Sequence, residues 1–408
     1  MRRPAPAAPA VAVYAGEEPP EEWDASVFLA GPTPRDGATP SWRPEALALI
    51  EGAAPPRGRL VVFVPEPRDG AWRADYADQV AWEDRWLGVA DVILFWVPRE
   101  MGAMPALTTN VEFGRYESSG RVVLGSPAGA AHMGYLRAFA RANGAPVVDS
   151  LRDAVAEALA AVGSGARRRG GQRDVPLLVW RTPVFSAWLA ALEAAGNTLE
   201  GARLLWSLRP DGVHPFFWAL HVAVLVASEG RVLSNDVVFA RTDTASVVAY
   251  RRSGAPLDAE VVMVREFRSP AISRDGMALG LPGGSGDPAT PMAEVAAAEL
   301  RDETGLSVDV SRLAPVGVRQ PLAAFSAHRQ HVFAVELTPG EIGRLRSDRS
   351  AHGEAGSQER TTVEVRRAGD LLSGPEADWS ALGAIAQAVL GPPQPRPAAP
   401  LTGRGRRP

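Results

Sequence analysis

Cysteine is absent from this chain of 408 residues, so disulfide bonds and thiolate metal sites are excluded. The absence also fits a reducing compartment, and we expect a cytoplasmic protein. Lysine is absent too, and all 43 basic residues are arginine, from which we draw no chemistry. No apolar run approaches the roughly 20 residues that a membrane-spanning helix needs. The N-terminus also lacks the continuous apolar core of a secretion signal.

The chain has almost no excess of either charge, because its 43 basic and 47 acidic residues leave a formal net charge of only −4. Without a basic field, we expect neither nucleic acid nor a membrane as a partner. The 46% of hydrophobic and 22% of charged residues are typical of a globular protein. The length favours two domains over one.

The first half of the chain alternates between apolar runs and helical stretches. Strands are predicted at 26–30, 60–64, 89–97, 121–125 and 146–148. Helices are predicted between them at 41–52, 77–88, 109–118, 131–142 and 150–162. This alternation indicates an α/β domain over 25–162 with a parallel sheet covered on both faces. We expect the Pro-, Ala- and Glu-rich residues 1–24 to be disordered.

A Gly- and Arg-rich stretch at 163–174 is predicted to be a linker with solvated arginines. The second domain is expected over 175–390, with a helix at 184–195 and strands at 202–208, 215–227, 236–241, 245–251, 259–266, 314–319, 331–337 and 361–366. Many strands with few helices favour an α+β sandwich. The Pro- and Arg-rich tail 391–408 is expected to be disordered.

The most informative stretch is 284–306, GSGDPATPMAEVAAAELRDETGL. A helix there would carry Glu299, Asp302 and Glu303 at positions i, i+3 and i+4, so that three carboxylates share one face within reach of one hard cation. Gly305 is predicted to end this helix as its C-cap. The residues alone leave a second interpretation open, which is a surface helix with a solvated acidic face.

This stretch resembles the Nudix box, with Gly283 and Gly284 in the preceding loop. The resemblance implies a Nudix sandwich fold over the second domain and a hydrolase that uses Mg²⁺ or Mn²⁺. It also implies that Glu299, Asp302 and Glu303 hold the metal, and that Glu299 and Glu303 belong to the catalytic set. The chain departs from the family pattern twice. Thr290 stands in place of the first Glu, and Ala298 stands in place of the Arg that steadies the carboxylates.

Residues 261–270, VVMVREFRSP, followed by LGLPGG, look like the ADP-ribose pyrophosphatase branch of that family. The branch implies that Arg265 and Arg268 bind the pyrophosphate through forked hydrogen bonds, although surface salt bridges would explain them as well. It also implies a general base in a mobile downstream loop, where Glu354 and Glu359 are the candidates.

Three short motifs mark the first domain. They are SVFLAGP at 26–32, with Gly31 and Pro32 at the end of a strand; WED at 82–84, followed by GVADVI at 88–93; and TNVEFG at 109–114. Together they resemble the nucleoside 2-deoxyribosyltransferase family, whose Rossmann- or flavodoxin-like fold also serves nucleotide N-glycosidases.

The resemblance implies that Glu112 is the nucleophile at the anomeric carbon of the sugar. A carboxylate suits that role because it stabilises or traps an oxocarbenium-like centre. Asp84 and Asp91 are the candidates for protonating the departing base. Purely structural roles stay open for these residues. Thr109 and Glu112 have the spacing of a helix capping box, and Asp91, at the start of a strand, can simply terminate an edge. The family often has a Tyr where this chain has Phe28.

The leading hypothesis is a bifunctional enzyme acting on small nucleotides. Its second domain would hydrolyse an ADP-ribose-like nucleotide sugar, and its first would cut or bind an N-glycosidic bond. The alternative is a nucleotide-sensing protein with an inactive Nudix site. A homodimer is compatible with either hypothesis.

Overall fold

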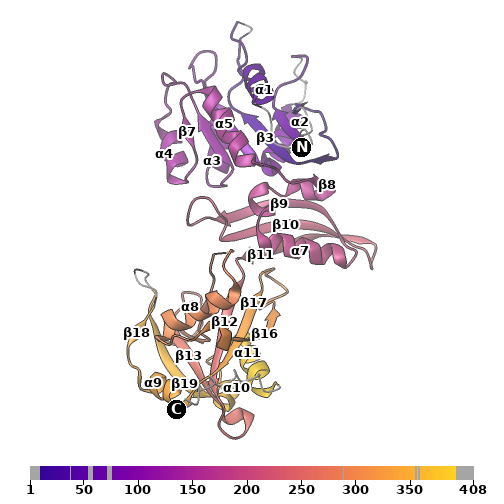
Figure 1. The fold of residues 1–408 in the computed structure, drawn as a ribbon. Coiled ribbons are helices and arrows are strands. Elements are labelled where there is room, and N and C mark those ends of the chain that lie inside the picture. The colour runs from indigo at the N-terminus through magenta and orange to yellow at the C-terminus, as the bar shows by residue number, and fades with distance from the viewer. Residues whose placement is uncertain are drawn as a thin grey trace, which may run out of the picture. The chain divides into compact units, whose positions relative to one another are not determined.

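The computed structural model describes residues 10–36, 38–53, 58–70, 76–287, 289–353, 356 and 359–391. The described chain forms two compact units, one ending at Arg241 and the other beginning at Thr242 (Figure 1).

The first unit is built on a six-stranded sheet in which every pair of neighbouring strands is parallel. Its strands, in spatial order, are β1 (Val11–Tyr14), β4 (Leu60–Val64), β3 (Ala25–Ala30), β5 (Val92–Trp96), β6 (Val122–Gly125) and β7 (Val147–Val148). Without β1, this is the 2-1-3-4-5 order of flavodoxin-like sheets. The α/β prediction for this domain is therefore confirmed.

Helices cover both faces of this sheet because its strands are apolar on both sides. On one face, α1 (Arg43–Gly52) and α5 (Leu151–Val162) pack on alternate strand residues such as Val27 and Leu29. On the other face, Phe28 and Phe63 lie beneath α2 (Tyr76–Val89), α3 (Leu107–Tyr116) and α4 (Gly134–Ala142). Near-continuous apolar strands are typical of a sheet buried in this way.

The predicted disorder of residues 1–24 is wrong for the part of the segment that the structure describes. β1 adds to the sheet edge with Val13 buried, and β2 (Glu22–Trp23) carries the buried Trp23. The apolar run VAVY can bury enough surface to offset its ordering cost. Residues 1–9 and 392–408 lie outside the described residues.

The stretch 163–174 is not a solvated linker. Its residues form β8 (Arg168–Arg169), which pairs with β2, and the 3₁₀ helix η1 (Gly170–Asp174). Arg168 is fully buried, because its guanidinium forms an ion pair with the buried carboxylate of Asp91. A run of arginines looks solvated in sequence, and only the fold supplies the acid that lets one of them be buried.

Residues 175–241 also belong to the first unit, whereas the predicted boundary preceded them. They form α6 (Leu177–Trp180), α7 (Pro183–Ala194) and a three-stranded antiparallel sheet of β9 (Thr198–Leu208), β10 (Phe217–Val226) and β11 (Arg231–Arg241). Trp218 of β10 packs on Phe185 of α7, and Leu177 joins the core of the parallel sheet. These apolar contacts group the segment with the first unit.

The second unit is a mixed eight-stranded sheet between two helical layers. Its main path runs β16 (Ala314–Arg319), β17 (Gln330–Glu336), β12 (Thr244–Arg251), β13 (Glu260–Phe267), β19 (Thr361–Arg367) and β18 (Ala351–His352), while β14 (Met277–Gly280) pairs with β13 and β15 (Gly283–Gly284) with β12.

Alternate residues of β12 face opposite layers: Val247 lies toward α8 (Met292–Thr304) and α9 (Pro339–Ser347), whereas Val248 lies toward α10 (Ala368–Ser373) and α11 (Trp379–Leu390). The helices α9, α10 and α11 were not predicted. The predicted glycine cap of α8 is confirmed, because Gly305 ends the helix at φ +69°. No helix among the described residues is long and apolar enough to cross a membrane.

Candidate functional sites

A cavity of about 200 Å³ in the first unit lies beyond the carboxyl ends of β3 and β4, and residues 105–112 around the start of α3 complete its lining. Ligands bind at this edge of open α/β sheets, where the strand order reverses. The lining comes from five segments that are distant in sequence: Gly31, Pro32, Thr33, Arg35, Arg43, Pro65, Gln79, Glu83, Pro105, Ala106, Leu107, Thr108, Thr109 and Glu112. The predicted residues Gly31, Pro32 and Glu112 are among them.

Arg43, at the start of α1, holds one wall of this cavity in place. Its buried guanidinium donates to the carbonyls of Leu29 (3.1 Å) and Gly31 (2.7 Å). It also donates to the hydroxyl of Thr33 (3.1 Å) and the carboxylate of Glu66 (2.6 Å). Four bonds from one rigid fork keep the turn after β3 from moving.

Gly31 is required in that turn. Its φ is +148°, and a Cβ there would lie 2.2 Å from the carbonyl oxygen of Trp96. Any side chain would therefore force β3 away from β5. Sequence reasoning placed Gly31 at the site, and the structure gives its physical role.

Helix α3 begins at the cavity wall. Its N-cap is Ala106, a non-glycine residue in the left-handed region at φ +58°, and no side chain caps the helix end. Thr109 lies inside the helix and is buried, so it does not form the capping box that the sequence allowed. The position of Glu112, one turn further along α3, is therefore not explained by capping.

Two carboxyl groups, those of Glu83 and Glu112, line the cavity. Burial raises the pKa of Glu112 to about 7, Coulomb repulsion from Glu83 contributes to this rise, and the charge of Arg43 opposes both effects. Burial also raises the pKa of Glu83, whose carboxylate accepts a hydrogen bond from the Gln79 amide at 2.8 Å. Such a pair can hold a proton and a negative charge in one site near neutral pH.

The structure does not bring the two predicted acids to this cavity. Asp84 is exposed and forms an ion pair with Arg115 on the helix surface. Asp91 is buried elsewhere, where it accepts hydrogen bonds from both guanidinium NH₂ groups of Arg168 and from the backbone and hydroxyl of Ser26. Asp91 is thus a structural residue. Phe28 packs in the core beside Phe63.

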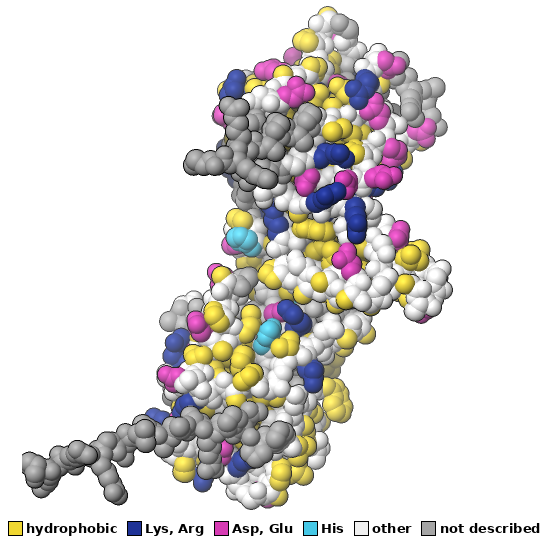
Figure 2. Space-filling model, turned by 45° about the vertical axis from the view of Figure 1, so that its right-hand side comes forward, with side chains coloured by type: hydrophobic (Ala, Val, Ile, Leu, Met, Phe, Trp, Pro, Cys, Tyr) yellow, Lys and Arg dark blue, Asp and Glu magenta, His cyan; other side chains and the backbone are white. Residues whose placement is uncertain are grey.

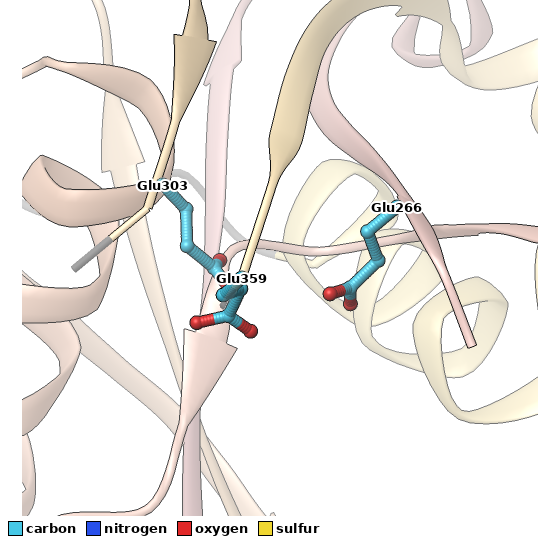
Figure 3. Close-up of side chains that lie close together, drawn as sticks. All are labelled: Glu266, Glu303 and Glu359. Carbon is cyan, nitrogen blue, oxygen red and sulfur yellow. The ribbon is translucent and has the colours of Figure 1, made fainter. Parts of the chain in front are cut away.

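In the second unit, three carboxylates from separate elements converge (Figure 3). Glu303 comes from the last turn of α8, Glu266 from β13, and Glu359 from just before β19. One oxygen of each lies within 4.8 Å of the others. The cluster offers several oxygen donors, which hard cations such as Mg²⁺ and Mn²⁺ prefer, so the residues present fit a divalent metal.

Glu303 is the most buried of the three, with only 2% of its surface exposed. Burial raises the pKa of Glu303 to about 8, and the carboxylates of Glu299, Glu266 and Glu359 contribute to this rise. A hydrogen bond from the backbone N–H of Gly283 to Glu303 (2.9 Å) opposes these effects. Burial likewise raises the pKa of Glu266.

The two predicted glycines, Gly283 and Gly284, lie directly against carboxylates of α8. Gly283 donates its N–H to Glu303. A Cβ on Gly284 would lie 2.3 Å from a carboxylate oxygen of Glu299. The loop therefore needs small residues so that α8 can bring its acids against the sheet.

The other predicted residues of the second site are dispersed. Asp302 forms a two-point ion pair with its neighbour Arg301 and does not join the cluster. Arg265 is bound to Asp275 (2.8 Å) and lies 3.6 Å from Glu364. Glu354 lies outside the described residues.

Arg268 and Glu359 do meet, since 3.6 Å separates the guanidinium of Arg268 from the carboxylate of Glu359. Glu359, one of the two candidates for the general base, also lies in the carboxylate cluster with Glu303.

Sequence reasoning missed Glu83, Arg43 and Glu266. Glu83 stands in the WED motif directly before the predicted Asp84. Its i, i+4 spacing from Gln79 on α2 was a signal that the sequence contained. Glu266 stands between the two arginines that were chosen. Arg43 carried no local signal, because its partners lie in other segments.

On the face shown in Figure 2, arginines and acids of the first unit are interspersed. Pairs such as Arg167 with Glu22 and Arg85 with Glu18 neutralise one another.

Comparison with known families identifies the family that part of the first unit resembles. Residues 24–130 match the family model described as "Nucleoside 2-deoxyribosyltransferase like". The match spans β3 to β6 and includes the turn after β3, both cavity carboxyls and the start of α3. The chain therefore has an N-terminal nucleoside 2-deoxyribosyltransferase-like domain. No curated protein matches the chain.

Proposed function

We propose that the first unit cleaves or exchanges the N-glycosidic bond of a nucleoside or nucleotide. The observation that carries this proposal is the cavity at the carboxyl ends of the strands, which Glu83 and Glu112 line together with Arg43. Arg35 and the uncapped start of α3 also line the cavity. Both favour an anionic substituent on the sugar, such as a phosphate.

In this mechanism the carboxylate of Glu112 attacks the anomeric carbon as the bond to the base breaks. The pair holds one proton, and the reactive form carries it on Glu83, which gives it to the departing nitrogen so that the base leaves neutral. The resulting sugar ester on Glu112 is then attacked by water, which completes hydrolysis, or by another base, which completes transfer. Glu83 accepts the proton that this second attack releases.

The test is product analysis by mass spectrometry with nucleosides and nucleoside monophosphates. Release of free base by the wild-type protein, lost by at least about 1,000-fold in Glu112→Gln, would support the proposal. Glu117→Gln is the matched control, because Glu117 ends the same helix and bonds Asn143 outside the cavity. Undiminished release by Glu112→Gln would contradict the proposed nucleophile.

For the second unit we propose a metal-dependent hydrolase of a nucleoside diphosphate derivative such as ADP-ribose. The converging carboxylates of Glu266, Glu303 and Glu359 support this proposal, as does the resemblance of 284–306 to the Nudix box. These three residues would hold the metal, which would neutralise charge on the pyrophosphate oxygens when bound. Glu299 lies beside Gly284 at the edge of the site.

The test is release of AMP and ribose phosphate from ADP-ribose with and without Mg²⁺. Glu303→Gln should lower turnover by orders of magnitude, since it removes a buried acid of the cluster. Glu294→Gln, an exposed acid in the first turn of the same helix, should not change turnover. Intact ADP-ribose that nevertheless raises the melting temperature would favour the sensing alternative.

A further inference from the structure

The carboxylate cluster of the second unit already contains a cation, the guanidinium of Arg268. One terminal nitrogen of Arg268 forms an ion pair with Glu266 and lies 3.6 Å from an oxygen of Glu359. Arg268 thus lies against two of the three acids that would hold a metal. A guanidinium and a divalent cation compete for these two carboxylates, because each needs the same oxygen lone pairs.

The contacts of Arg268 allow it to leave. The contact to each of the two acids is made by the same terminal nitrogen. Half of the Arg268 side chain is exposed, compared with 13% for Glu266, so its charge is well solvated and the pairs are weak. The backbone is held separately, through the Arg268 N–H and the carbonyl of Gly276 at 3.1 Å. The side chain can therefore swing while its attachment point stays fixed.

Arg265, three residues earlier, behaves differently. Its guanidinium is bound to Asp275 and lies near Glu364, neither of which belongs to the cluster. Arg265 and Arg268 therefore contact different acids, although both lie near the end of β13. Of these two, Arg268 is the one that faces the acids that a cation would need.

We propose that Arg268 is a displaceable counter-ion: it neutralises the cluster while no metal is bound, and the arriving divalent cation releases it. The freed guanidinium then remains within reach of the site and can bind an anionic phosphate group of the substrate. This inference rests on the proposed metal site of the second unit. It makes Arg268 a positioning residue that links cation binding to substrate binding.

The experiment is a titration of the full-length protein with Mn²⁺ alone, followed by electron paramagnetic resonance and calorimetry without substrate. Arg268→Gln should bind Mn²⁺ on the order of tenfold more tightly than wild type, the size expected for removing one competing and half-exposed charge about 4 Å away. Glu266→Gln should bind about tenfold more weakly. Arg268→Lys keeps the charge and should stay within about threefold of wild type.

Arg265→Gln is the matched control and should leave Mn²⁺ affinity unchanged. If wild type binds Mn²⁺ and Arg268→Gln binds it equally or more weakly, the counter-ion role is overturned while the metal site stands. An Arg268→Lys variant that matches Arg268→Gln would overturn the role as well. If neither wild type nor any variant binds Mn²⁺, the proposed metal site itself fails.

Discussion

At the scale of single residues, the cavity of the first unit holds two carboxyl groups at a cost in stability. Glu83 and Glu112 are brought together in a partly buried site, where burial and the charge of Glu83 disfavour ionisation of Glu112. A carboxylate held in this way costs folding free energy unless a ligand compensates for it. Replacing a carboxyl group held in this way is therefore expected to stabilise the protein.

We predict that Glu112→Gln stabilises the protein at pH 8 but not at pH 4. The folded pKa of Glu112 is raised to about 7, above its ordinary value. The folded state therefore keeps a proton that the unfolded state loses, so stability is greatest below about pH 4.5 and is lost as pH rises through 7. Replacing the acid should recover about 1 to 3 kcal/mol at pH 8. Thermal unfolding across this pH range measures the gain, and an equal gain at pH 4 would contradict the assignment.

The same pKa sets a prediction for activity. The proposed mechanism needs one proton on the pair, with Glu112 ionised and Glu83 protonated, so the pH profile of kcat/KM for base release should have a limb that falls as pH rises through about 7, where the pair loses its last proton. Arg43 opposes the raised pKa of Glu112 by its positive charge. Glu66→Gln, which removes the carboxylate bound to Arg43, should therefore move this limb. A limb that stays near pH 4.5 would mean that another group controls the rate.

At the scale of elements, the short strand β8 is attached to the parallel sheet through one buried ion pair. Arg168 bonds both oxygens of Asp91 at the start of β5, and one of those oxygens also accepts the backbone N–H of Leu177. The pair thus joins three segments of the first unit. Removing one partner of such a pair leaves a buried charge without compensation.

We predict that Arg168→Met lowers the stability of the first unit by about 3 to 5 kcal/mol. Arg167→Met, at the adjacent position, should cost less than about 1 kcal/mol, because the pair of Arg167 with Glu22 is exposed. Urea denaturation of both variants makes the comparison. Similar midpoints for the two would show that β8 does not hold the first unit together.

At the scale of the whole molecule, the division into units predicts which fragments fold. A fragment ending at residue 162 would lack Arg168 and the segment that covers Asp91, whereas one ending at Arg241 keeps both. We expect the longer fragment to unfold cooperatively and the shorter one to be destabilised by about 3 to 5 kcal/mol. Circular dichroism during urea titration distinguishes them. Equal stability of the two fragments would support the domain boundary at residue 162 that was predicted from the sequence.

Local signals in the sequence were enough for the elements that depend on nearest neighbours. The strands of the parallel sheet from β3 onward and the five helices around it follow from apolar periodicity, and their observed limits lie within a few residues of the predicted ones. The end of α8 at Gly305 follows from the preference of glycine for positive φ. Motif order and spacing identified Glu112, Gly31 and Glu303 as candidates.

The partners of these residues were decided only by tertiary structure. Arg168 looked like a solvated linker residue until the fold placed Asp91, 77 positions away, against its guanidinium. Glu83 and Glu266 became candidates because packing brought them beside Glu112 and Glu303. The physical reason is that charge and burial depend on distances in space. Sequence periodicity reports on a residue's own helix or strand, and carries no measure of what faces it from another element.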